Sequence, residues 1–97
     1  MMRDRREILE SGDSMLKVFK LVPKNHEGYS YGYYELFVIA AESIPDALET
    51  MYKHVSPEKD PIPYYLRSSN IAIEHIGNVE LFKKGSQIIA YDYYSGD

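Results

Sequence analysis

The sequence predicts an α+β fold, in which a four-stranded antiparallel sheet carries one main helix on one of its faces. Two observations lead to this class. Four runs are rich in Val, Ile, Phe and Tyr, and between the second and third of them lies a run whose apolar positions repeat with helical spacing. The predicted order is therefore strand, strand, helix, strand, strand. A chain of 97 residues has the length of one domain.

Two strands open the predicted domain. Residues 16–23, LKVFKLVP, alternate and end at a proline, which cannot continue a strand ladder. Residues 33–41, YYELFVIAA, form the second strand, and the polar loop before them predicts a wide hairpin. Alternation divides this strand into one face with Tyr34, Leu36, Val38 and Ala40, and another with Tyr33, Glu35, Phe37 and Ile39. Both faces are largely apolar, which indicates a central strand or a second contact surface, and we expect Tyr34 to belong to the core.

Residues 43–55, SIPDALETMYKHV, predict the main helix. Ser43 is a good N-cap with Asp46 three residues later, and Pro45 lies in the first turn. The apolar positions follow i, i+3, i+4 spacing and predict one face that packs on the sheet, formed by Ile44, Ala47, Leu48, Met51, Tyr52 and Val55.

The second half of the chain predicts a long loop and two more strands. Residues 56–70 are polar and proline-rich, and loops of this length in compact domains are usually functional or disordered. Residues 71–77, IAIEHIG, predict the third strand, and residues 86–94, SQIIAYDYY, predict the last one. The residues between them fit a short strand or a helical turn. We expect the last two strands to form a second hairpin.

The domain is predicted to begin at Met15, so that residues 15–97 form the single α+β domain. Residues 1–14 are expected to be an extension or a short helix with Asp4 as its N-cap. They contain charges but no apolar stretch of the kind that secretory signals have. The longest apolar run, residues 36–41, is far shorter than the roughly 18 residues that a membrane span needs.

Composition disfavours several classes of function. The chain has no cysteine, which excludes a disulfide framework and a thiol nucleophile and fits a reducing, cytoplasmic location. Its net charge is −4, and the eleven basic residues are scattered along the sequence. Binding to a phosphate backbone depends on clustered Lys and Arg, so we expect no nucleic-acid partner.

No motif predicts catalysis or metal binding. His26, His54 and His75 lie on three different elements without metal-ligand spacing, and His75 is the one expected to be partly buried. The letters GYSYG, at 28–32, match a nucleophile elbow, but a loop precedes the serine and a strand follows it, which is the wrong context. The carboxylates near the helix start are explained by capping. We therefore expect neither an enzyme nor a cofactor.

Tyrosine usage is the unusual feature, with ten Tyr, three Phe and no Trp. Tyrosine forms strands well and pairs across them, so packing alone could explain it. Tyrosine also provides rigid contact area with a polar tip, which suits interfaces. If the second and last strands are neighbours, their rings form one patch, and a pair in the polar loop has the least reason to be core. The binding candidates are Tyr29, Tyr31, Tyr33, Tyr64, Tyr65, Tyr91 and Tyr93.

The opening KVFKLV, a tyrosine-bearing loop, FVIAAES running into a helix, and the pair Ile76-Gly77 form a recognisable pattern. With it, residues 15–97 resemble short uncharacterised proteins encoded by bacteriophages and prophages. The resemblance implies a small α+β fold and a phage accessory role in the host cytoplasm, and it implies no activity.

The sequence favours a small non-enzymatic interaction protein that binds a host protein or itself through a tyrosine-rich surface. We expect a homodimer, because one helix cannot cover both apolar faces of the sheet. The alternative is a protein that binds or sequesters a small nucleotide-like ligand by stacking it on tyrosine.

Overall fold

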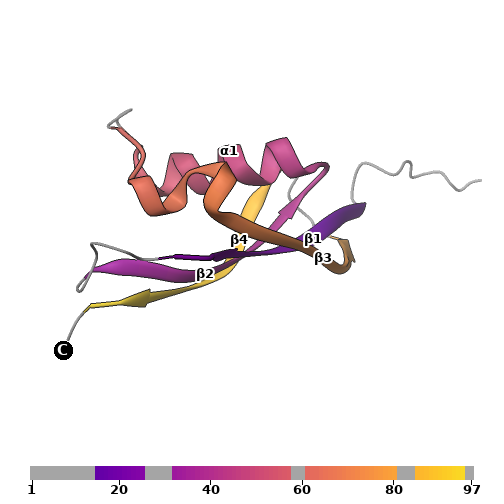
Figure 1. Cartoon of the computed structure of the whole chain (residues 1–97). Helices are drawn as coiled ribbons and strands as arrows, with labels where there is room; N and C mark the ends of the chain where they lie inside the picture. Colours follow the sequence, from indigo (N-terminus) through magenta and orange to yellow (C-terminus); the bar gives the residue numbers. More distant parts are fainter. Residues whose placement is uncertain (1–14, 26–31, 58–60, 81–84, 96–97) are drawn as a thin grey trace, which may run out of the picture.

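The computed structural model describes residues 15–25, 32–57, 61–80 and 85–95. It confirms the predicted α+β class, with one four-stranded antiparallel sheet and one α-helix packed on it (Figure 1). The strands are β1 (Met15–Pro23), β2 (Tyr33–Ala41), β3 (Ile71–Glu80) and β4 (Gln87–Tyr94). The predicted extension, residues 1–14, lies outside the described residues.

The strand order is β3-β1-β2-β4. The first predicted hairpin is confirmed, because β1 and β2 pair antiparallel in the centre of the sheet. The second is wrong: β3 pairs with β1 and β4 pairs with β2, so the last two strands form opposite edges. Crossing three strand spacings requires about 14 Å, which a connection of six or seven residues can reach. The short connection between β3 and β4 is therefore compatible with strands at opposite edges of the sheet.

A bulge in β2 corrects the predicted faces of this strand. Tyr34 lies opposite Tyr93, and Leu36 lies opposite Asp92, so Glu35 is an extra residue without a cross-strand partner in this pairing. An extra residue interrupts the alternation of side chains along the strand. The prediction that Tyr34 shares a face with Leu36 is therefore wrong.

Tyr34 instead lies on the face that carries Phe37, with the two ring centroids 4.8 Å apart. That face is the one covered by the helix. Phe37, Ile39 and Ala41 on this face are fully buried, and so is Ala40 on the other face. β3 and β4 each contain an extra residue as well, Ile76 and Ile89, at the irregular points of their ladders.

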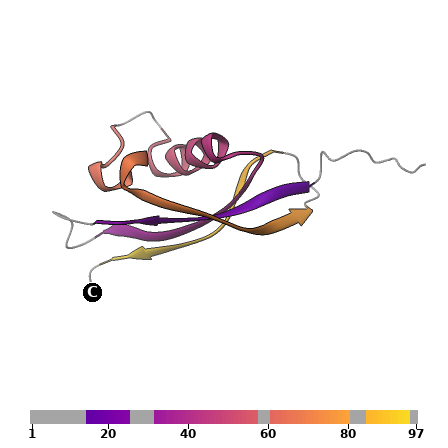
Figure 2. The same ribbon diagram turned by 45° about the vertical axis from the view of Figure 1, so that its right-hand side comes forward.

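The helix α1 (Ile44–Val55) matches the predicted one. Ser43 is its N-cap, and the backbone N–H of Asp46 donates a hydrogen bond to the Ser43 side chain over 3.3 Å. Ala47 and Met51 are its buried residues, whereas Ile44 at its start is exposed. Helix α1 lies along one face of the sheet in both ribbon views (Figures 1 and 2).

The second half of the predicted loop is folded. Two short 3₁₀ turns, η2 (Tyr64–Leu66) and η3 (Ser68–Asn70), lead into β3 on the same side of the sheet as α1 (Figure 2). The side-chain amide of Asn70 donates hydrogen bonds to the carbonyl oxygens of Asn25 and Tyr65, at 2.9 and 2.7 Å. The backbone N–H of Lys24 in turn donates to the Asn70 carbonyl. These bonds fasten the turns to the end of β1.

The core lies between the sheet and the layer formed by α1 and η2. Its largest fully buried side chains are Phe37, Leu21, Ile39, Met51 and Leu66. Three of the expected helix-face residues, Leu48, Tyr52 and Val55, pack against this cluster while staying partly exposed. Burial of such side chains supplies most of the favourable free energy of folding.

The face of the sheet that points away from α1 carries apolar side chains together with Lys20, Glu74 and Asp92. Cross-strand pairing places Val18 beside Ala40, and Val22, Leu36 and Val38 follow on the same side of their strands. Val18, Val22, Leu36 and Val38 remain partly exposed. Within the described ranges, no helix covers this face (Figure 2).

Candidate functional site

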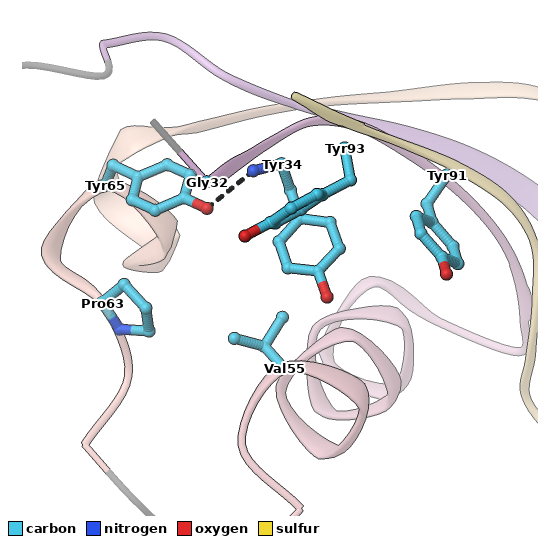
Figure 3. Close-up of a pocket in the computed structure, with 7 residues that line it drawn as sticks. All are labelled: Gly32, Tyr34, Val55, Pro63, Tyr65, Tyr91 and Tyr93. Carbon is cyan, nitrogen blue, oxygen red and sulfur yellow. Dashed lines mark hydrogen bonds between the residues drawn. The ribbon is translucent and has the colours of Figure 1, made fainter. Parts of the chain in front are cut away.

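A cleft lined by tyrosines lies where β2 and β4 meet the end of α1 and the η2 turn. Its volume is about 400 Å³. The described residues that line it are Gly32, Tyr34, Val55, Pro63, Tyr65, Tyr91 and Tyr93. Figure 3 shows these side chains converging from four separate segments of the chain.

Tyr34 is the central ring of the cleft. Its centroid lies 4.7 Å from that of Tyr93 and 5.6 Å from that of Tyr91, with interplanar angles of 66° and 68°. Steep, edge-to-face arrangements of this kind are favourable for aromatic rings. The three rings therefore form an angled wall rather than a flat stack.

The far side of the cleft is formed by η2. The ring of Tyr65 is only 3% exposed, and its hydroxyl oxygen accepts a hydrogen bond of 2.7 Å from the backbone N–H of Tyr34 (Figure 3). This bond joins the η2 turn to the start of β2. Pro63 and Val55 complete that side of the cleft.

Gly32 lines the cleft beside Tyr93. Its φ of +63° lies in the left-handed region that favours glycine. A Cβ at this position would lie 2.7 Å from the Tyr93 hydroxyl oxygen, which is too close without movement of that ring. The absence of a side chain at residue 32 thus allows Tyr93 its position in the wall.

The electrostatics of the cleft are those of neutral phenols. Burial, followed by the nearby Tyr91 and Tyr93, raises the pKa of Tyr34 above its ordinary value of 10.0. Tyr34 therefore keeps its proton at neutral pH. Among the described lining residues, none carries a formal charge.

His54 lies behind the wall, on the last turn of α1. Its ring centroid is 4.8 Å from that of Tyr91 and 5.8 Å from that of Tyr34. It is exposed to solvent and supports the rings from the helix side. No local pattern indicates this contact, because it depends on the pairing of β4 with β2.

The cleft brings together three of the predicted binding residues: Tyr65, Tyr91 and Tyr93. Tyr91 and Tyr93 share one face of β4, as predicted, and each is about half exposed. Tyr33 lies beside this group, with its ring centroid 6.3 Å from that of Tyr65. β2 and β4 are neighbours, as the predicted patch required, but the β2 ring that meets Tyr91 and Tyr93 is Tyr34. Tyr33 instead pairs with Tyr94, with the two ring centroids 5.3 Å apart.

The other candidates are not part of the cleft. Tyr64 is 69% exposed, and the Arg67 guanidinium lies over its ring at 5.1 Å from the centroid. The expectation that the loop offers little packing is confirmed for Tyr64 but wrong for Tyr65, because η2 turns that ring into the core. Tyr29 and Tyr31 lie outside the described residues.

Sequence reasoning placed Tyr34 in the core and missed its place in the cleft wall. Alternation along β2 does not predict the position of Tyr34, because the bulge at Glu35 interrupts the alternation and has no signature in the sequence. Pro63 and Gly32 also line the cleft, although the sequence indicates only that they form loops.

The described residues contain no candidate metal site. No group of three His, Cys, Asp or Glu side chains within them could hold a metal ion. The prediction that His75 is partly buried is wrong: the residue is exposed on an edge strand, and its Nε2 lies 2.8 Å from the Gly77 carbonyl oxygen. No helix in these ranges is long and apolar enough to cross a membrane.

Comparison with known proteins returned no match to any family model, curated protein or solved structure.

Proposed function

We propose that this chain is a non-enzymatic binding protein that holds a partner protein through the tyrosine-lined cleft and its rim on β4. The observation that carries the proposal is the half-exposure of Tyr91 and Tyr93 beside a cleft of about 400 Å³. Tyr65, which serves packing, is buried, whereas Tyr91 and Tyr93 keep about half of their surface in solvent. Large, rigid rings with polar tips are typical of residues that dominate binding energy.

The proposed partner is a host protein, in keeping with the phage or prophage origin that the sequence pattern suggests. The cytoplasm is the proposed location, since the chain carries no cysteine. Self-association is a second part of the proposal. The partly exposed apolar face of β1 and β2 is the surface that a second copy would cover, since extended apolar patches usually mark interfaces.

A small ligand is the second candidate occupant of the cleft. Its volume falls within the roughly 300–1,000 Å³ that ligand pockets have, which is the observation that favours it. The described lining residues provide aromatic faces but no positive charge for a phosphate group. Of the nucleotide-like ligands, a neutral base or nucleoside therefore fits this lining better than a nucleotide.

The test compares two variants with the unaltered protein in affinity capture from bacterial lysate. The first variant carries Tyr91→Ala and Tyr93→Ala, which open the cleft wall. The control is Tyr64→Ala, an exposed tyrosine that lies outside the cleft. A captured protein that is lost with the double variant and kept with the control supports the proposal.

Capture that is equally strong with all three proteins contradicts the use of this cleft. A tightly bound ultraviolet-absorbing compound that is released when the purified protein is denatured would favour the small-ligand candidate instead.

A further inference from the structure

The walls of the cleft are aromatic faces and edges without a formal charge among the described lining residues. Tyr91 and Tyr93 stand at 68° and 66° to the plane of Tyr34, and all three rings line the same cleft. The faces of aromatic rings carry negative potential, and a cation within about 6 Å of a ring centroid is attracted to it. Rings that line one cleft can add these attractions for a single bound cation.

The same chain already shows one such contact at its surface. The Arg67 guanidinium lies over the Tyr64 ring at 5.1 Å from its centroid. The rings of the cleft wall contact one another and the ring of His54, and none of the described Lys or Arg residues lines the cleft. The net charge of −4 also favours the approach of a cation over that of an anion.

The described lining contains no carboxylate, and this composition favours cations that need no hydrogen-bond acceptor. A primary ammonium or a guanidinium group carries N–H donors that need acceptors when they leave water. A quaternary ammonium group has no N–H donor, and its recognition by aromatic rings is well known. The attraction comes from the face of the neutral ring, and Tyr34 keeps its proton at neutral pH.

We infer that the cleft is an aromatic receptor for a quaternary ammonium group, whether that group belongs to a free choline-like molecule or to a trimethylated lysine of a partner protein. The inference rests on the proposed function, because it names the chemistry of the group that the same cleft binds. Tyr34, Tyr91 and Tyr93 supply the rings, and Val55 and Pro63 supply apolar contact for the methyl groups.

The experiment is an NMR titration of the whole chain labelled with carbon-13 in its tyrosine rings. The probes are choline and its uncharged isostere, in which a tert-butyl group replaces the trimethylammonium group. The two probes have nearly the same shape, so their difference in affinity reports the charge. We expect choline to shift the signals of Tyr91 and Tyr93 in a saturable manner, and the isostere to bind at least about tenfold more weakly.

Variants test the rings without removing the fold. Tyr93→Phe keeps the aromatic face and is expected to bind choline within about threefold of the unaltered protein, whereas Tyr93→Leu is expected to lose about tenfold. Tyr64→Leu, outside the cleft, is the control and should leave binding unchanged. The comparison of the two probes needs no variant, so the inference stays testable if Tyr93→Leu fails to fold.

A further arm distinguishes the two sources of the group. A peptide with one trimethyllysine is titrated beside the same peptide with unmodified lysine. Binding of the methylated peptide that is much tighter than that of choline assigns the group to a protein side chain, and equal affinity assigns it to a free molecule.

Equal binding of choline and its isostere would overturn the cation inference and leave the proposed binding cleft in place. No binding of choline or of the methylated peptide would overturn it as well. The proposed function fails separately, if capture of a partner is unchanged by Tyr91→Ala and Tyr93→Ala.

Discussion

Tyr65 performs two structural tasks at the scale of a single residue. Its ring is buried in the core, and its hydroxyl oxygen accepts the N–H of Tyr34 at 2.7 Å. The hydroxyl therefore satisfies a backbone donor at the start of β2, and the ring fixes η2 against the sheet. The neighbouring Tyr64 has neither task, because its ring is mostly in solvent.

We predict that Tyr65→Phe lowers the free energy of unfolding by about 1 kcal/mol, the usual value of one hydrogen bond. Tyr65→Ala should cost about 3 kcal/mol or more, as for other large buried aromatic side chains. Tyr64→Ala should change stability by less than about 0.5 kcal/mol. Urea denaturation of the three variants checks this series, and a loss at Tyr64 equal to that at Tyr65 would contradict it.

Tyr34 predicts a dependence of stability on alkaline pH. Its pKa is raised in the folded protein by burial and by the neighbouring Tyr91 and Tyr93. An acid whose pKa is raised on folding holds its proton more tightly in the folded state than in the unfolded one. Its contribution is fully present below the ordinary value of 10.0 and is lost as the pH rises above that value.

The expected result is a fall in the free energy of unfolding above about pH 10, measured by urea denaturation at several pH values. Tyr34→Phe cannot ionise, so its stability should fall less steeply over the same range. Parallel pH profiles for the two proteins would show that other groups cause the loss.

Gly32 affects how β2 and β4 place their tyrosine rings. Together with the extra residue Glu35, it sets the position of Tyr34 and Tyr93 in the cleft wall. An L side chain with a positive φ costs about 1–2 kcal/mol, and here the new Cβ also meets the Tyr93 hydroxyl.

We predict that Gly32→Ala destabilises the protein by about 2 kcal/mol and also displaces the Tyr93 ring. Gly85→Ala is the matched control, because Gly85 has a φ of +92° with nothing within 4 Å of an added Cβ. Both variants strain the backbone, but only Gly32→Ala should alter the tyrosine signals of the cleft in an NMR spectrum. Identical changes in those signals for both variants would contradict this role of Gly32.

The elements themselves could largely be predicted from the sequence. The range of β2 and the start of α1 at Ser43 follow from hydrophobic periodicity and from capping, which are local properties. The pairing of β3 with β1 and of β4 with β2 is not local. It depends on which edges of the central hairpin the returning chain reaches, and a short connection suggested the wrong answer.

The candidate site could be predicted only in part, for the same reason. The sequence indicated that Tyr91 and Tyr93 share a face, since that needs only alternation. It could not place Tyr34 beside them, because the bulge at Glu35 reverses the alternation at one point. Nor could it show that η2 buries Tyr65 while leaving Tyr64 exposed, because three-residue turns leave no periodic signal.

At the scale of the whole molecule, the sheet carries apolar side chains on both faces, and the described residues place a helix on one of them. Val18, Val22, Leu36 and Val38 are partly exposed on the other face. Covering this face by a second copy would form a symmetric dimer, the commonest closed assembly.

We predict that the protein sediments as a dimer at micromolar concentrations and that Val38→Glu makes it a monomer. The new carboxylate would lie beside Lys20, its cross-strand neighbour, so the fold of each copy should tolerate it. Sedimentation velocity checks the prediction. A monomer in the unaltered protein would contradict it.

The central claim is that the half-exposed rings of Tyr91 and Tyr93 bind a partner and contribute little to the stability of the fold. Urea denaturation of the double variant Tyr91→Ala, Tyr93→Ala tests this claim most directly, with Tyr65→Ala as the reference for a core ring. The account predicts a loss of about 1 kcal/mol for each rim ring, the scale of an exposed aromatic pair, against about 3 kcal/mol or more for Tyr65. A loss for each rim ring as large as that for Tyr65 would contradict the account and show that these tyrosines are packing.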